Sequence, residues 1–324
     1  MRRREFTRLV GGAIVLAVSD ISFAVAQDRV RRIGALITTP LAKAVLEKVL
    51  GERGWTLGRN LLIDYRITGG ETERSRQGAR ELLAANPDVI FATTNTSMAA
   101  LQAEGSRVPT VFAMVSDPVG MHYVASFARP GGNVTGFTPF EPTLGGKWIS
   151  LLKEVAPDLV RVGVIYNPEP GNNSAAFRQS IDEVANRTGI ASIETPKRDV
   201  AGIEELIFSF REKPNSGLIF LPDAVTAVQK DRMVAIVTEC RLPAVYSLRL
   251  FCDAGGLISY GPDLKKMYAG AASYVDRILR GAKPAEMPVQ APTEFELIIN
   301  QKAARQVGVR LPSALIARAD DVIE

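Results

Sequence analysis

The feature that most constrains the fold is an alternation of aliphatic runs with amphipathic stretches. In the first half of the chain, short aliphatic runs are separated by stretches with helical periodicity, several of which end at glycine. We expect strands at residues 31–37, 61–67, 87–94 and 108–114, and helices at 41–54, 71–86 and 96–106. Continuous aliphatic strands that alternate with helices predict an α/β fold whose parallel sheet is covered on both faces.

The second half of the chain repeats this order from residue 160. The first and third strands of each half are 56 residues apart, measured from Ile33 to Val89 and from Val162 to Leu218. This duplication predicts two similar Rossmann-like lobes in tandem, not one large sheet. The matching segments are "RRIGALITTP" (31–40) with "VRVGVIYNP" (160–168), "PDVIFATT" (87–94) with "SGLIFLPD" (216–223), "VPTVFAM" (108–114) with "LPAVYSL" (242–248), and "PGGNVTGF" (130–137) with "AGGLISYG" (254–261).

A tail remains after the second unit, with a helix expected at 264–284, a strand at 293–300 and a helix from 301. A chain that crosses between two domains more than once would need such a tail. We therefore expect a multi-strand hinge near residues 136–146, 259–264 and 286–293. The expected lobes are residues 28–136 with 264–285, and residues 145–258 with 293–324.

The first 26 residues have the features of an export signal. A cationic start, "MRRREFTRLV", precedes an apolar run of about ten residues, and Ala24, Val25 and Ala26 form the small-x-small pattern of a signal peptidase site. The run is shorter than the roughly 20 apolar residues of a transmembrane helix. We expect cleavage of residues 1–26 and a soluble protein in the bacterial periplasm. The arginines fit a twin-arginine signal and a general secretory signal equally well.

The charge balance of the mature chain excludes a nucleic-acid-binding class. The whole chain has 39 basic and 35 acidic residues. Removing the four arginines and two acidic residues of the signal leaves 35 basic and 33 acidic residues, a net charge of +2. A nearly neutral domain without a basic cluster does not indicate nucleic acid as a partner.

The two cysteines leave two alternatives open. Cys240 and Cys252 would lie in an oxidising compartment, and their separation permits a disulfide. They are slightly better explained as two partly buried thiols that pack as small hydrophobic groups.

Polar residues follow the expected strands, where ligands of open parallel sheets bind. Ser116 and Asp117 end one strand, and Thr94, Asn95 and Ser97 lie at a helix start whose N–H groups favour a carboxylate. The second lobe would add Asn167 and Asp223, together with Tyr246 and Tyr260. These groups could hold both ends of a zwitterion across a cleft. Their structural alternatives are helix caps for Thr94, Asn95 and Ser97, a turn for Asp117 and packing for the tyrosines.

Few features of the sequence favour an enzyme. No phosphate-binding glycine loop, metal-ligand spacing or Ser/His/Asp set is present, and His122 is the single histidine. The alternative is a two-domain hydrolase or racemase that would use Asp117 and Asp223 as paired carboxylates. A ligand-sensing regulator would need a DNA-binding or membrane segment. We expect no catalytic residue, metal or cofactor.

Several segments of the chain resemble a known family. "GGNVTGF", "GGKWISLLKEVAP", "GGLISYGPD", "AASYVDRILRGAKPAEMPVQAPTEFELIIN" and "ARADDVIE" resemble exported substrate-binding proteins of ABC transporters, over almost the whole mature chain. The resemblance implies a type I periplasmic binding protein fold, related to tryptophan- and branched-chain amino acid-binding proteins. It also implies capture of a small amino-acid-like or carboxylate solute between the lobes, delivery to permease subunits in the inner membrane, and a monomer.

The chain departs from the pattern of this family at "ITTPLAKAVLEKVLGERGW", where a longer segment would precede the helix. We therefore expect a shortened first cleft loop that contains Thr38 and Thr39. The full set of residues expected to bind the solute is Thr38, Thr39, Thr94, Asn95, Ser97, Ser116, Asp117, Asn167, Asp223, Tyr246 and Tyr260.

Overall fold

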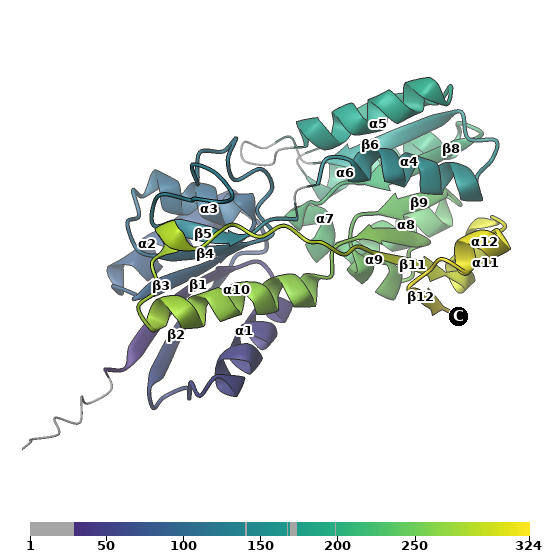
Figure 1. Ribbon diagram of the computed structural model, residues 1–324. Coiled ribbons are helices and arrows are strands. Elements are labelled where there is room, and N and C mark those ends of the chain that lie inside the picture. Colours follow the sequence, from purple (N-terminus) through teal and green to yellow (C-terminus); the bar gives the residue numbers. More distant parts are fainter. Residues whose placement is uncertain (1–28, 140, 167, 169–173, 198) are drawn as a thin grey trace, which may run out of the picture.

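The computed structural model describes residues 29–139, 141–166, 168, 174–197 and 199–324, which form two α/β lobes (Figure 1). Each lobe is built on one sheet. The first sheet has the order β2 (Leu61–Ile67), β1 (Arg31–Ile37), β3 (Val89–Thr93), β4 (Thr110–Ala113), β5 (Val134–Phe137). The second has the order β12 (Asp321–Ile323), β11 (Glu296–Asn300), β10 (Ile258–Gly261), β9 (Ala244–Tyr246), β8 (Ser216–Phe220), β6 (Arg161–Tyr166), β7 (Ala191–Pro196). The predicted two-lobe α/β fold is confirmed.

The duplication is visible in the strand order. The order β2-β1-β3-β4-β5 of the first sheet recurs as β7-β6-β8-β9-β10 in the second, and these neighbours are all parallel. The register differs by one residue, because Ile33 pairs with Val89 whereas Leu218 pairs with Gly163 and not with Val162. The strand expected at 293–300 forms β11 of the second sheet, but the sequence did not predict its pairing, which is antiparallel with β10 and parallel with β12.

Helices cover both faces of the first sheet. On one face, α1 (Pro40–Glu52) packs beside α10 (Leu264–Leu279), and their apolar residues share a core with those of β1, β3 and β4. On the other face lie α2 (Thr72–Ala84) and α3 (Thr94–Ala103). Helix α10 follows the second lobe in sequence but completes the core of the first. Its Tyr268, Ala271 and Val275 are buried there.

The second sheet is covered in the same way. The core of one face contains residues of α4 (Leu144–Val155), α5 (Ala175–Arg187), α11 (Gln301–Val307) and α12 (Ser313–Ile316). The core of the other face contains residues of α6 (Val200–Arg211), α8 (Lys230–Glu239) and α9 (Arg249–Asp253). The short helix α7 (Ala224–Val228) follows β8, and the 3-10 turn η1 (Pro284–Glu286) follows α10.

The chain passes between the lobes three times, after β5, after β10 and after η1 (Figure 1). The first and third passages are hydrogen-bonded to each other, since the Gln290 N–H donates to the Gly136 oxygen at 2.9 Å and the Thr138 N–H donates to the Gln290 oxygen at 2.9 Å. The strands that lead into the first and second crossings, β5 and β10, each contain a glycine in close contact with the neighbouring backbone. A Cβ would lie 2.1 Å from the Phe112 oxygen at Gly136 and 1.9 Å from the Ser247 oxygen at Gly261, so neither position tolerates a side chain.

The remaining expectations concern the export signal, membrane-spanning helices and the two cysteines. The expected signal, residues 1–26, lies outside the described residues. Within the described part, no helix combines the length and apolar character needed to cross a membrane. Cys240 and Cys252 are both free and buried, which agrees with the packing alternative.

Candidate functional site

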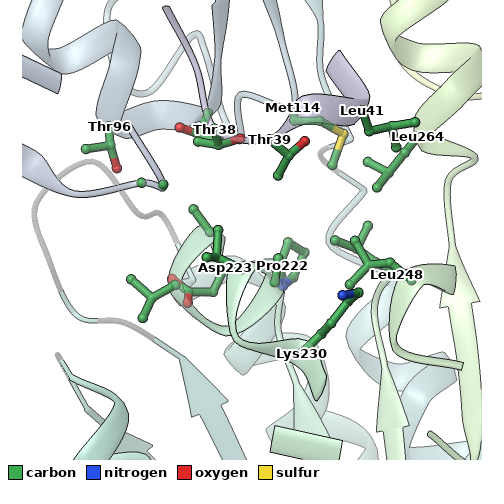
Figure 2. Close-up of a pocket in the computed structure, with 18 of the residues that line it drawn as sticks. Thr38, Thr39, Leu41, Thr96, Met114, Pro222, Asp223, Lys230, Leu248 and Leu264 are labelled. Carbon is green, nitrogen blue, oxygen red and sulfur yellow. The ribbon is translucent and has the colours of Figure 1, made fainter. Parts of the chain in front are cut away.

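A cavity of about 540 Å³ lies between the two lobes, at the carboxyl ends of strands from both sheets (Figure 2). This volume is in the usual range for a small-molecule site. The first lobe and α10 contribute Thr38, Thr39, Pro40, Leu41, Ile67, Gly69, Gly70, Arg74, Thr94, Asn95, Thr96, Met114, Ser116, Leu264 and Tyr268 to its wall. The second lobe contributes Pro222, Asp223, Ala224, Val225, Ala227, Val228, Lys230, Leu248 and Leu250.

The first-lobe wall is held by hydrogen bonds between strand ends. Asn95 accepts from the Ser116 N–H at 2.7 Å and donates to the Ser116 oxygen at 2.9 Å, so its side chain joins the start of α3 to the segment after β4. The Thr38 N–H donates to the Thr93 hydroxyl at 2.9 Å. These bonds between buried groups position the cavity wall before any solute binds.

Backbone strain is concentrated at this edge. Thr94, Met114 and Asp117 follow β3 and β4 and have φ angles of +78°, +60° and +46°. A left-handed conformation is unfavourable for residues other than glycine, above all for a β-branched one. Strained residues gather at binding and catalytic sites, where the surrounding fold maintains them. The Thr94 hydroxyl oxygen is buried and has no hydrogen-bond partner among the described residues.

The charged residues of the cavity wall differ in their partners. Asp223 is the N-cap of α7 and accepts from the Thr226 N–H at 2.8 Å. Arg74 donates to Glu71 at 3.1 Å and to the Ile67 oxygen at 3.2 Å, within the first lobe. Lys230 begins α8, and its ammonium lies 3.0 Å from an oxygen of the next residue, Asp231.

One end of the cavity is lined by polar groups of both lobes, and the other end mostly by apolar side chains (Figure 2). Thr96 of the first lobe and Asp223 of the second lie at the polar end. Met114, Leu41 and Leu264 line the upper side of the other end, and Leu248 lies opposite them. We call these the polar end and the apolar end of the cavity.

Tyr268 contributes a neutral phenol to the cavity wall. Burial raises its pKa to about 12, although a hydrogen bond with Thr39 acts in the opposite direction. The ring packs edge-on against Phe91 of the first sheet, with 6.5 Å between the ring centres. Tyr268 therefore adds an uncharged, largely apolar surface to the cavity.

Six of the eleven residues that the sequence predicted for the site line the cavity. They are Thr38, Thr39, Thr94, Asn95, Ser116 and Asp223. Asn167 lies outside the described residues.

The other four predicted residues do not line the cavity. Ser97 is fully buried in α3. Asp117 accepts from the Gly120 N–H at 2.9 Å, the turn role that was its alternative. The expectation that both tyrosines face the cleft is corrected. Tyr246 is 1% exposed and stacks between Phe220 and Phe251, while Tyr260 packs beside Phe295.

Sequence reasoning missed the apolar end and the lysine. Leu41, Leu248 and Leu264 each lie at or just before the start of a helix that follows a strand or a crossing. A leucine in such a place has the same pattern as a core residue, so no signal marked it. Lys230 could have been noticed as a cation in the first turn of a helix, where the helix dipole favours anions.

The described residues provide no metal centre, because they contain no group of three or more acidic, histidine or cysteine side chains suited to a metal ion. His122, the single histidine of the sequence, is exposed in a loop after β4 and is not part of the cavity wall.

Known proteins resemble this chain in sequence and in fold. A curated relative described as a tyrosine-binding protein, from Clostridioides difficile strain R20291, is 24% identical over 274 residues, which are 84% of this chain and 78% of the relative. A crystal structure of a conserved domain protein from Vibrio cholerae is 28% identical, has a TM-score of 0.83 and matches 91% of this chain and 100% of that one.

A Streptococcus pneumoniae structure described as an ABC domain in complex with L-Trp is 22% identical, has a TM-score of 0.83 and matches 90% of this chain and 99% of that one. It shares the fold. The sequence model of one family, described as ABC transporter substrate binding protein, matches residues 41–323. The family resemblance found in the sequence is therefore confirmed, and the chain belongs to the ABC transporter substrate-binding proteins.

Proposed function

We propose that this protein is the periplasmic component of an ABC importer and captures an amino acid with a large apolar side chain between its lobes. The observation that carries the proposal is the division of the cavity into a polar and an apolar end. A zwitterion with an apolar side chain has the same division. The cavity wall is mostly apolar, as is usual for small-molecule sites whose few polar groups fix the orientation of the ligand.

The polar end would hold the charged head of the solute. Helix α3 begins at Thr94, and its first N–H groups, with the Thr94 and Thr96 hydroxyls, can donate to a carboxylate. Asp223 of the opposite lobe would accept from the ammonium by charge-assisted hydrogen bonds. Of the two aspartates expected at the site, Asp223 is part of the cavity wall and Asp117 is not, which favours Asp223 for this role.

The apolar end would hold the side chain of the solute. Leucine, methionine and tyrosine side chains from both lobes could surround an aromatic or branched aliphatic group. Two relatives support this class of ligand, since one is described as tyrosine-binding and the structure of another contains L-Trp. Binding would be completed by closure of the lobes about the three crossings, a hinge motion.

The remaining parts of the proposal concern the route of the solute. The cationic and apolar start of the sequence supports export to the periplasm. The family supports a permease of the inner membrane as the partner. We expect a monomer that closes on the solute, presents it to the permease and performs no chemistry.

A thermal-shift screen of the purified mature protein tests this function. Amino acids with aromatic or large aliphatic side chains should raise the melting temperature, whereas glycine, alanine and serine should not. A solute at 100 times its dissociation constant should add about 2.7 kcal/mol to the free energy of unfolding. If no amino acid of the first group stabilises the protein, the proposed solute class is wrong.

Asp223→Ala tests the site, and Asp199→Ala is its matched control. Asp199 is the N-cap of α6 and accepts from the Gly202 N–H at 2.7 Å, but it is not part of the cavity wall. Both substitutions should cost about 1 kcal/mol of stability through the lost cap. Only Asp223→Ala should also weaken binding, by about 2–5 kcal/mol, or roughly 30-fold to several-thousand-fold. Equal affinity of the two variants would contradict this role of Asp223.

A further inference from the structure

The proposed head-group site does not account for Lys230, which lies elsewhere in the cavity wall. Its side chain rises from α8 toward the space between Pro222 and Leu248, at the apolar end (Figure 2). The Asp223 carboxylate lies toward the other end of the same wall. The solute head and Lys230 are therefore separated along the cavity, and the apolar body of the solute would lie between them.

The fold gives no separate reason for a lysine at this position. Lys230 is the first residue of α8, where a positive charge is unfavourable for the helix dipole. Its ion pair is with the adjacent Asp231, whose side chain is 77% exposed. An exposed pair of this kind contributes about 0–1 kcal/mol. The lysine is thus neither a helix cap nor part of a buried structural ion pair.

The surroundings of the ammonium determine what it can bind. The Lys230 side chain is 33% exposed, and the apolar side chain of Leu248 lies near it in the cavity wall (Figure 2). A solute that fills the apolar end would displace water from the ammonium. A charged donor that loses water without gaining an acceptor is costly, so the site should discriminate against solutes with a purely hydrocarbon end.

We propose that Lys230 is a specificity-determining residue that donates a hydrogen bond to an oxygen at the far end of the solute's apolar body. This inference rests on the proposed function. The ligand class is an amino acid whose side chain is apolar along its length and ends in an oxygen acceptor, either a phenolic hydroxyl or a carboxylate. Lys230 would distinguish such solutes from their hydrocarbon analogues.

The test compares three probes by titration calorimetry: L-phenylalanine, L-tyrosine and 4-carboxy-L-phenylalanine. The parent protein should bind the two oxygen-bearing probes more tightly than L-phenylalanine. Lys230→Met should weaken their binding by roughly tenfold to 100-fold, the loss expected for a hydrogen bond from a charged donor. Its affinity for L-phenylalanine should stay the same or increase. The control, Lys265→Met, removes a lysine from the first turn of α10 outside the cavity wall and should change none of these values.

The outcomes separate this inference from the proposed function. If Lys230→Met weakens all three probes by the same factor, Lys230 binds the common head group and the inference is wrong, while the proposed function survives. If it changes none of them although the parent binds them, Lys230 does not contact the solute. If the parent binds none of the three probes, the role of Lys230 is wrong, and the thermal-shift results for the large aliphatic amino acids then decide whether the proposed function survives. The melting temperature without ligand, measured for each variant, shows that it is folded.

Discussion

A contact between the lobes at Gly70 allows a direct test of closure. Gly70 lies in the turn between β2 and α2 of the first lobe, and Ala224 is the first residue of α7 in the second. A Cβ added at Gly70 would lie 2.5 Å from the Ala224 Cβ. Two such carbons pack at about 3.5–4.0 Å, so the Gly70→Ala variant would have to hold the lobes about 1 Å farther apart at this point.

Gly70→Ala should have two effects, one on folding stability and one on solute binding. Gly70 has a φ angle of +82°, and alanine in this conformation costs about 1–2 kcal/mol of folding stability whether the lobes are open or closed. The clash acts only in an arrangement of the lobes in which Gly70 and Ala224 are in contact, as they are in the structure, and overpacking typically costs about 1–3 kcal/mol. This second part should weaken solute binding by roughly fivefold to 150-fold.

A glycine of the first lobe outside the cavity wall provides a matched control. Gly58 has a φ angle of +77°, and a Cβ added there would meet nothing within 4 Å. Gly58→Ala should therefore lower the unfolding free energy as much as Gly70→Ala does but leave the affinity unchanged, with binding measured by calorimetry for an amino acid from the screen. Adding Ala224→Gly to Gly70→Ala should restore affinity. If Gly70→Ala binds as tightly as Gly58→Ala, the contact is not part of the bound arrangement.

Two other predictions concern strain and charge. Thr94→Gly should raise the unfolding free energy in urea by about 1 kcal/mol, because glycine adopts the left-handed conformation without strain. The variant should also bind the solute more weakly, because the hydroxyl is lost. Lower stability of the variant would show that Thr94 is not strained. Burial, followed by the nearby Asp263, raises the pKa of Glu296, although Arg249 opposes this. The folded protein therefore holds this proton more tightly than the unfolded chain, and the stabilisation is lost as the pH rises through the raised pKa. Glu296→Gln should accordingly raise the melting temperature at pH 7 and have little effect near pH 4, and a gain independent of pH would contradict this account.

The architecture could be predicted from the sequence because parallel strands buried on both faces have a distinctive pattern. The runs "RRIGALI" and "VRVGVIY" contain consecutive aliphatic residues bounded by charge and turn residues, and they form β1 and β6 at equivalent places in the two sheets. The antiparallel β11 could not be predicted. The run "TEFELIIN" identifies a strand, but strand direction depends on where the chain re-enters the sheet, and that is a property of the crossings.

The sequence predicts those site residues that are polar and follow a strand. It does not predict whether a side chain within a strand points toward the cleft or into the core. Thr38, Thr94 and Asp223 each follow a strand directly or closely, and strand ends converge on the cleft in any fold of this kind. Tyr246 is the last residue of a three-residue strand, where a change of one position moves a side chain to the other face of the sheet. The sequence does not specify this position, and the ring lies in the core.

The return of α10 to the first lobe has a consequence for how the chain can be divided. Because Tyr268, Ala271 and Val275 complete the first core, a fragment that ends before residue 264 would leave only α1 on one apolar face of its sheet and would uncover part of that face. The same fragment would lack β11 and β12 of the second sheet. Truncation from the carboxyl end therefore damages both lobes at once. Although the sequence contains the same pattern twice, neither copy is a module that could be expressed, exchanged or fused alone, and a protein that preserves one lobe must join segments from distant parts of the chain.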